Sequence, residues 1–293
     1  MLTDRSTFFD TAETLAASLP PLMVRADRLA SAVSLGVHGR RKAGIGQSFW
    51  QFHHYRSGDS ATAIDWRQSA RSDHLYVRER EAEAAQSVWL WRDGSASMRF
   101  SSGGESKIDR ASLLALALGV LLVRGGERVA LFGMPDAPAN SRAATRRIGF
   151  ALSALAPKDD VVPPDAQLPR HAQFIWFGDF LAPLEQIETA IRRLTRANAG
   201  GRLVHIIDPA EEDFPYSGRT RFESVHGDAS RILGRAESVA GDYRARFKAH
   251  SEAVAIMARK LGWNYLAHRT DRSPQTALVA LYSDLGGGKR TIS

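Results

Sequence analysis

The sequence contains no cysteine. Disulfides, thiolate nucleophiles, zinc–thiolate sites and iron–sulfur clusters are therefore excluded for this chain. Lysine is scarce, since only six of the 39 basic residues are lysine and the others are arginine. A phosphate-cradling G-x-x-x-x-G-K-[ST] loop is missing as well. We therefore do not expect the chain itself to hydrolyse ATP.

Long apolar runs are also missing. The longest, 113–123, has eleven residues between Arg110 and Arg124, whereas a helix that spans a bilayer needs about 20. The first residues carry early acids and no basic start before an apolar run, which is not the pattern of a secretory signal. The sequence therefore predicts a cytoplasmic protein with no membrane span.

The charge balance is strongly basic, with a net charge of +7 and a pI of about 10.0. Arginine binds phosphate oxygens through a planar fork of donors, so nucleic-acid binding is the alternative function. The arginines are scattered along the chain rather than gathered in a run. They are not accompanied by a recognisable reading motif or by a basic stripe with stacking aromatics. Nucleic acid is therefore not the leading prediction for the partner.

The pattern along the chain changes near residue 86. Before it, helical spacing interrupted by Pro20 and Pro21 leads into a glycine- and aromatic-rich stretch and an extended, charged segment. After it, short apolar strands alternate with helices. We therefore predict N-terminal helices and a further segment over 1–85, followed by one larger domain over 86–293.

The alternating half predicts an α/β fold with a doubly wound, mostly parallel sheet covered on both faces. The strand 88–91 is expected at its centre. The expected strands are 88–91, 128–133, 172–178, 203–208 and 263–268, the helices are 107–124, 145–155, 183–197, 237–261 and one from 273, and a hairpin joins 222–226 to 231–234. In such sheets ligands bind beyond the carboxyl ends of the strands, where the strand order reverses.

The first of these strands ends in a D-x-S-x-S motif formed by Asp93, Ser95 and Ser97. Alternate residues of a tight loop can point the same way, so one carboxylate and two hydroxyls can converge. A later strand ends at Asp179, which the fold would bring beside them. Hard oxygen ligands suit Mg²⁺ or another hard divalent cation. The alternative is that Asp93 and Ser95 only cap the segment that follows.

This motif with its strand-end aspartate resembles the metal-ion-dependent adhesion site (MIDAS) of von Willebrand factor A domains. Upstream, the Y-R-x-G-D and I-D-W-x-x-x-A-R stretches resemble the signature of the domain-of-unknown-function 58 family. The signature residues are Tyr55, Arg56, Gly58, Asp59, Ile64, Asp65, Trp66, Arg67, Ala70 and Arg71. The resemblance extends from about Gly39 to Leu285. It implies a von Willebrand factor A-like fold and association with MoxR-type AAA+ ATPases, which help to assemble or mature other proteins.

The chain departs from the adhesion-site pattern at one ligand. A-type domains usually supply a threonine from the loop before the aspartate strand, and the corresponding stretch 157–165 has none. Asp159 or Asp160 is a possible substitute, whereas Thr145 lies too early, inside an expected helix. This departure bears on metal affinity and not on the fold.

The signature admits two interpretations. Its mixed charges beside Trp66 indicate either an ion-pair network that docks the N-terminal segment onto the A-like domain, or a face that binds a partner. A metal-dependent hydrolase is a further alternative for the Asp93 motif, but the sequence offers no obvious general base or second metal centre. The leading prediction is a non-enzymatic, metal-assisted protein-interaction module or adaptor that works with a MoxR-type ATPase.

Overall fold

The chain divides into two units. The computed structural model describes residues 21–38, 49–55, 64–72, 74–80, 86–154, 161–166, 168–196, 199–223 and 230–287. Residues 38–85 form a small unit, and helix α2 (Pro21–His38) up to residue 37 joins the chain from Gln86 onward in the main unit. Ala26, Ala30 and Val33 of α2 are buried in the core of the main unit, so α2 belongs to a different unit from the signature segment that follows it in the sequence.

The small unit is built on an antiparallel pair of strands, β1 (Phe49–His54) and β2 (Tyr76–Arg80). The short helix α3 (Trp66–Ser69) lies between them in the sequence, and the Asp65 side chain caps it by accepting a hydrogen bond from the Gln68 amide at 3.0 Å. β2 agrees with the extended, charged segment expected after the signature.

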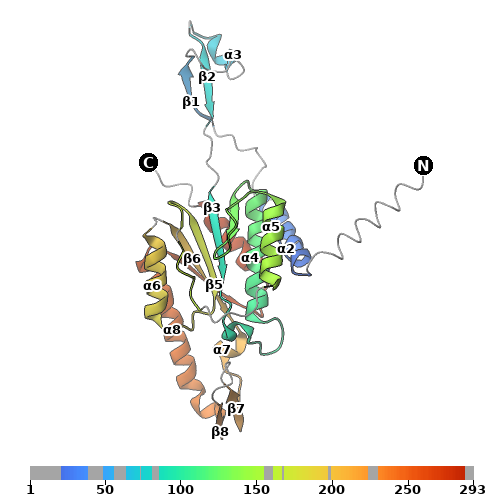
Figure 1. Ribbon diagram of the computed structural model, residues 1–293, viewed down its shortest axis with the longest axis vertical. Coiled ribbons are helices and arrows are strands. Elements are labelled where there is room, and N and C mark those ends of the chain that lie inside the picture. The colour runs from blue at the N-terminus through green and yellow to red at the C-terminus, as the bar shows by residue number, and fades with distance from the viewer. Residues whose placement is uncertain are drawn as a thin grey trace, which may run out of the picture. The chain divides into compact units, whose positions relative to one another are not determined.

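The main unit has a parallel sheet at its centre, so the expected mixed α/β architecture is confirmed (Figure 1). All four strand pairings are parallel and follow the order β4-β3-β5-β6-β9. The strands are β3 (Ser87–Arg92), β4 (Arg128–Leu131), β5 (Gln173–Gly178), β6 (Gly200–Ile207) and β9 (Asn264–Arg269). The expectation that 88–91 is central needs a correction. β3 is an interior strand, but β5 is the middle one, because strand order depends on crossovers that a local pattern does not encode.

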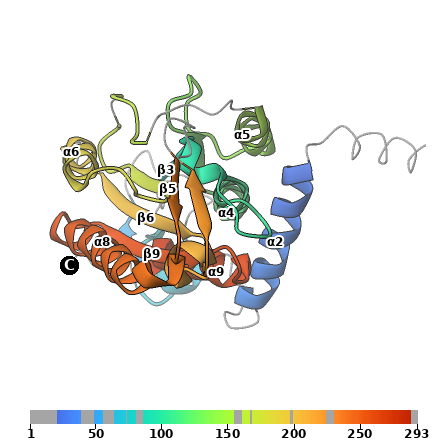
Figure 2. The ribbon, with the colours of Figure 1, turned by 90° about the horizontal axis from the view of Figure 1, so that it is seen from below.

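Helices cover both faces of this sheet (Figure 2). Helices α4 and α9 pack on one face, with α2 and α5 against α4, and helices α6 and α8 pack on the other. The helices are α4 (Lys107–Arg124), α5 (Arg142–Ala154), α6 (Leu184–Thr195), α7 (Pro209–Asp213), α8 (Ala240–Lys260) and α9 (Pro274–Gly287), with the short 3-10 helices η2 (Ala96–Arg99) and η3 (Ala236–Val239). Among the described helices, none combines the length and hydropathy that a bilayer span requires.

The expected hairpin is present as β7 (Thr220–Glu223) and β8 (Ser230–Leu233), paired antiparallel. Both strands follow β6 and α7, so the hairpin emerges from the carboxyl edge of the sheet. Helix α8 then returns the chain to β9, which is the parallel connection expected from the sequence.

Gly201 on β6 packs directly beneath an aromatic ring. A Cβ atom at this position would lie 2.2 Å from ring carbons of Trp263, which is almost fully buried and donates a hydrogen bond to Thr195. We expect Gly201→Ala to lower the free energy of unfolding by about 1–3 kcal/mol, because the added methyl group overpacks the core and either the Trp263 ring or the backbone must move. Denaturant unfolding of the full chain measures this difference.

The matched control is Gly241→Ala in the first turn of α8, where a Cβ would meet nothing within 4 Å. This change should be neutral or stabilising by roughly 0.4–1 kcal/mol, because it restricts the unfolded chain. Equal effects of the two substitutions would contradict the packing of Gly201 against Trp263.

Candidate functional site

The D-x-S-x-S loop and the later aspartate meet at the switch point of the sheet. Asp93 directly follows β3 and Asp179 directly follows β5, and these neighbouring strands lead to opposite sides of the sheet. The backbone amide of Asp93 donates to the carbonyl of Phe177 at 2.8 Å. Both aspartates are 2% exposed. Both aspartates therefore lie at the carboxyl edge of β3 and β5, where ligands of such folds bind.

A line of hydrogen bonds joins the two carboxylates. The amide of Ser95 donates to Asp93 Oδ1 at 2.8 Å, and the hydroxyl oxygens of Ser95 and Ser97 lie 3.0 Å apart. The Ser97 hydroxyl in turn hydrogen-bonds the Asp179 carboxylate. The structure thus brings together all four residues that the sequence predicted as metal ligands. The alternative that Asp93 and Ser95 cap the following segment is supported in part, because the Asp93 carboxylate accepts a hydrogen bond from the Ser95 amide and so closes a turn.

A buried lysine, which the sequence analysis did not identify, also belongs to this cluster. Lys107 is the first residue of α4 and is 0% exposed. Its Nζ lies 2.9 Å from Asp179 Oδ2 and also pairs with Glu211 Oε1 from α7. We call Asp93, Ser95, Ser97, Lys107, Asp179 and Glu211 the edge cluster. The one signal in the sequence was a lysine at the start of a helix, where the helix dipole disfavours a cation.

The pKa values of the two aspartates in the edge cluster are shifted in opposite directions. Burial, and next the charge of Asp179, raise the pKa of Asp93 to about 7, against smaller opposing effects of Ser95 and Lys107. Burial also acts to raise the pKa of Asp179, but the Lys107 ammonium and hydrogen bonds from Ser97, Lys107 and the Leu181 amide outweigh it, so that pKa is lowered. Asp179 is therefore an ionised partner of Lys107, and Asp93 is the carboxylate without a cation of its own.

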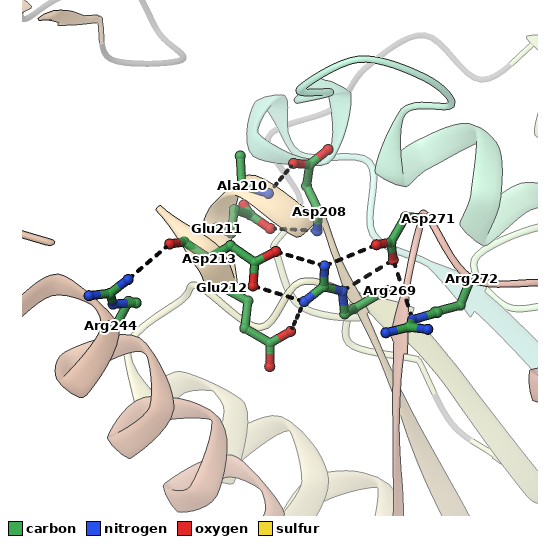
Figure 3. A network of polar contacts seen from close by, with 9 residues as sticks. All are labelled: Asp208, Ala210, Glu211, Glu212, Asp213, Arg244, Arg269, Asp271 and Arg272. Carbon is green, nitrogen blue, oxygen red and sulfur yellow. Dashed lines mark hydrogen bonds and ion pairs between the residues drawn. The ribbon is translucent and has the colours of Figure 1, made fainter. Parts of the chain in front are cut away.

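Glu211 links this cluster to a second polar network, shown in Figure 3. It forms a capping box with Asp208, whose backbone amide donates to Glu211 Oε2 at 3.0 Å. The next two acids of α7, Glu212 and Asp213, pair with Arg269 at the end of β9, which also pairs with Asp271. Helix α7 is thus fastened to α4 on one side and to β9 on the other.

Two residues at the same edge have a strained backbone. Phe180 and Phe214 are buried and have φ values of 51° and 46°, in the left-handed region that bulky residues rarely adopt. Phe180 follows Asp179, whose Oδ1 accepts a hydrogen bond from the Leu181 amide at 3.2 Å. The turn leaves the Leu181 side chain 47% exposed. Asp179 therefore fixes a turn that presents an apolar side chain to solvent.

The edge cluster does not fit a resident dication in the predicted way. Asp179 Oδ2 is bonded to the Lys107 ammonium and Oδ1 accepts a hydrogen bond from a backbone amide, so both oxygens of Asp179 already have partners within the chain. Within the described part of the chain, no group of three or more histidine or acidic side chains is arranged to hold a metal ion. The Thr145 hydroxyl donates to the Arg142 carbonyl within α5 and takes no part. Asp159 and Asp160 lie outside the described residues.

The signature residues lie in the small unit. Ile64 bridges to Val77, Asp65 caps α3, and Trp66 is 65% exposed within the described chain. Tyr55, Arg67, Ala70 and Arg71 are exposed, and Arg56, Gly58 and Asp59 lie outside the described residues. Docking of this segment onto the main unit stays a prediction.

His268 near the end of β9 gives a prediction about acid stability. Its Nε2 lies 2.8 Å from the Arg110 guanidinium, and because arginine only donates, this nitrogen must accept and the ring must be neutral. Burial, and next the charge of Arg110, lower the pKa of His268 to about 4 from an ordinary 6.5. Between these values the unfolded chain binds the extra proton, so stability is lost as the pH falls through this window, by up to about 1.4 kcal/mol per unit.

Denaturant unfolding between pH 7 and pH 4 should show a shallower loss for His268→Gln than for the unchanged chain, since the glutamine oxygen still accepts from Arg110 without titrating. Identical slopes in the two proteins would show that His268 is not held neutral.

Comparison with known proteins agrees with the sequence signature. Residues 51–253 match the family described as "Protein of unknown function DUF58". Uncharacterized proteins from Mycobacterium tuberculosis and Mycobacterium bovis are each 26% identical over 273 residues, which cover 88% of this chain and 86% of theirs.

Two solved structures were also found to be similar. An aerotolerance-related membrane protein from Bacteroides fragilis matches with 12% identity and a TM-score of 0.44, and BatB from Bacteroides thetaiotaomicron with 13% identity and a TM-score of 0.39. Each match covers 69% of this chain and 100% of the other. The family match covers well over half of the chain and includes most of the small unit and the whole edge cluster, so the protein belongs to the DUF58 family.

Proposed function

We propose that this protein is a non-enzymatic interaction module with a von Willebrand factor A-like fold, an adaptor that works with a MoxR-type AAA+ ATPase in protein assembly or maturation. The parallel sheet and the D-x-S-x-S loop at its switch point support the fold assignment. The resemblance of the DUF58 signature to ATPase-associated proteins supports the partner. The chain has no phosphate-binding loop of its own, so a second protein would supply any energy from ATP.

The observation that carries the proposal is the presentation of Leu181. An exposed leucine by itself is ordinary, but this one follows a left-handed phenylalanine and is held by a hydrogen bond to a buried, ionised aspartate. Strained backbone of this kind persists where the surroundings enforce it, and it concentrates at binding sites and switches. An apolar side chain on a backbone held in this way suits an anchor for a protein partner, because less chain entropy is lost when the partner binds.

The experiment measures binding of the full chain to the purified MoxR-type ATPase of the same organism. Leu181→Gln should weaken binding by roughly tenfold or more, as expected for the loss of an anchor worth about 1.4 kcal/mol. The matched control is Ile256→Gln on α8, because Ile256 is 46% exposed and so nearly equal in exposure to Leu181. If both variants bind as well as the unchanged chain, Leu181 and the sheet edge around it are not part of the contact.

A chelator arm tests the metal-assisted contact predicted from the motif. Loss of binding on chelation, restored by Mg²⁺, would support a contact through an ion at Asp93. Binding that survives chelation indicates a contact without metal.

The alternative of nucleic-acid binding is less well supported. Many of the arginines are used within the chain, as in the pairs of Arg202 with Asp284 and of Arg110 with Glu105. Arg269 alone faces three acids. A complex that dissolves on nuclease treatment and contains no ATPase would favour this alternative over the adaptor.

A further inference from the structure

Lys107 lies where a lysine is costly. As the first residue of α4 it places a cation at the positive end of the helix dipole. It is also fully buried, which penalises an ammonium unless carboxylates compensate. The compensation comes from two elements far apart in the sequence, since Asp179 follows β5 and Glu211 lies in α7. A position that opposes both the dipole and solvation indicates a specific requirement for positive charge at this point.

The oxygens around Lys107 are those that a hard cation would use. Asp179 contributes Oδ2 at 2.9 Å from Nζ and Glu211 contributes Oε1, while Asp93 and Ser97 adjoin through the hydrogen-bonded loop. Carboxylates and hydroxyls of this kind form sites for Mg²⁺ and Mn²⁺, with oxygen–metal distances about 0.5–1 Å shorter than the ammonium contact. The ammonium therefore lies close to where such an ion would bind, and the two cations exclude each other.

We propose that Lys107 is the resident cation of the edge cluster, so that the side chain of this lysine takes the place of a dication and the site works without metal. The ammonium ties Asp179 to α7 through Glu211, and Asp179 in turn holds the turn at Leu181. The positive charge is covalently part of the chain, so neither chelation nor metal supply alters it. A partner's carboxylate is not ligated here, because the ammonium is enclosed by the protein's own acids.

This assignment predicts a gain of function on removing the lysine. Lys107→Ala leaves the buried carboxylates of Asp179 and Glu211 without the cation they share, while the Ser97 hydroxyl stays bonded to Asp179 and Asp93 lies at the other end of the hydrogen-bonded loop. Neighbouring carboxylates without a cation repel one another, and a dication relieves this repulsion. The variant should therefore bind Mn²⁺ where the unchanged chain does not.

The test titrates the chelator-treated full chain with Mn²⁺ alone and follows binding by calorimetry and by the paramagnetic signal of free Mn²⁺. We expect no binding to the unchanged chain that depends on Asp93, and an affinity of Lys107→Ala higher by roughly tenfold or more. Thermal unfolding should respond to Mn²⁺ only in the variant. Lys107→Ala/Asp179→Asn should lose the gain, and Lys248→Ala, at an exposed lysine paired with Glu252, should show none.

Two results would overturn the proposal. One is Mn²⁺ binding by the unchanged chain that Asp93→Ala abolishes, because the dication would then coexist with Lys107. The other is a folded Lys107→Ala protein that binds no Mn²⁺. If this variant does not fold in chelator, it is refolded with Mn²⁺ and, in parallel, with a salt of equal ionic strength. Recovery with Mn²⁺ but not with the salt supports the proposal. If the variant refolds under neither condition, Mn²⁺ binding by the unchanged chain and by Asp93→Ala decides.

Discussion

Replacement of Lys107 by methionine is expected to lower the free energy of unfolding by about 3–5 kcal/mol, the usual cost of removing one partner from a buried ion pair. The substitution keeps the length and apolar stem of the side chain, so the loss comes from the carboxylates of Asp179 and Glu211, which stay buried without their cation. Denaturant unfolding of the variant and of the unchanged chain at neutral pH measures this loss.

The control and the rescue separate charge from packing. Lys248→Met removes an exposed pair with Glu252 and should cost about 0–1 kcal/mol. Lys107→Met combined with Asp179→Asn should recover a large part of the loss. Burying an uncharged amide beside methionine costs less free energy than burying a carboxylate there. A double variant no more stable than Lys107→Met would contradict the pairing of Lys107 with Asp179.

Replacement of Asp93 by asparagine is expected to stabilise the protein at alkaline pH, although Asp93 begins the most recognisable motif of the chain. The pKa of Asp93 is raised to about 7 by burial and by Asp179, from an ordinary value of 3.8. Between these values the folded chain binds the proton more tightly than the unfolded chain, so stability falls as the pH rises from about 4 to 7. The full penalty applies above pH 7 and amounts to at most about 4 kcal/mol, at about 1.4 kcal/mol per unit.

Asparagine removes this penalty and can still accept the hydrogen bond from the Ser95 amide. We therefore expect Asp93→Asn to gain about 1–4 kcal/mol at pH 8 and little at pH 4. Asp179→Asn should show the opposite sign at pH 8, because it leaves Lys107 with one acid. Destabilisation by Asp93→Asn at pH 8, removed by a chelator, would mean that a bound cation holds Asp93 ionised.

The architecture could be predicted because its signals are local. Each element can be recognised from a short stretch of sequence, as with the apolar strand 172–178 and the helix 107–124 with its clear ends. The order of the strands could not be predicted, since it depends on which side of β3 each crossover takes. The place of α2 could not be predicted either, because the residues that cover its apolar stripe come much later in the sequence.

Four members of the edge cluster were predictable from the sequence, whereas Lys107 and Glu211 were not. Asp93, Ser95 and Ser97 form a compact motif, and Asp179 ends a strand that had to lie nearby. Lys107 is 72 residues from Asp179 and 104 from Glu211, and neither separation corresponds to a helical or strand repeat. Only the folded chain shows that Asp179, the aspartate at the end of the later strand, already has a cation as neighbour.

Helix α2 is completed by residues that the ribosome has not yet made when α2 emerges. Its Asp27 pairs with Arg124, 97 residues later, and its buried face rests on α4 and α5, with the small unit encoded in between. At synthesis rates of about 5–20 residues per second, the apolar stripe of α2 waits roughly 5–20 s for its cover. During that interval β1 and β2 can already pair, because they are close in sequence. We therefore expect the small unit to fold first, and the apolar stripe of α2 to stay uncovered on the nascent chain until α4 and α5 have been made.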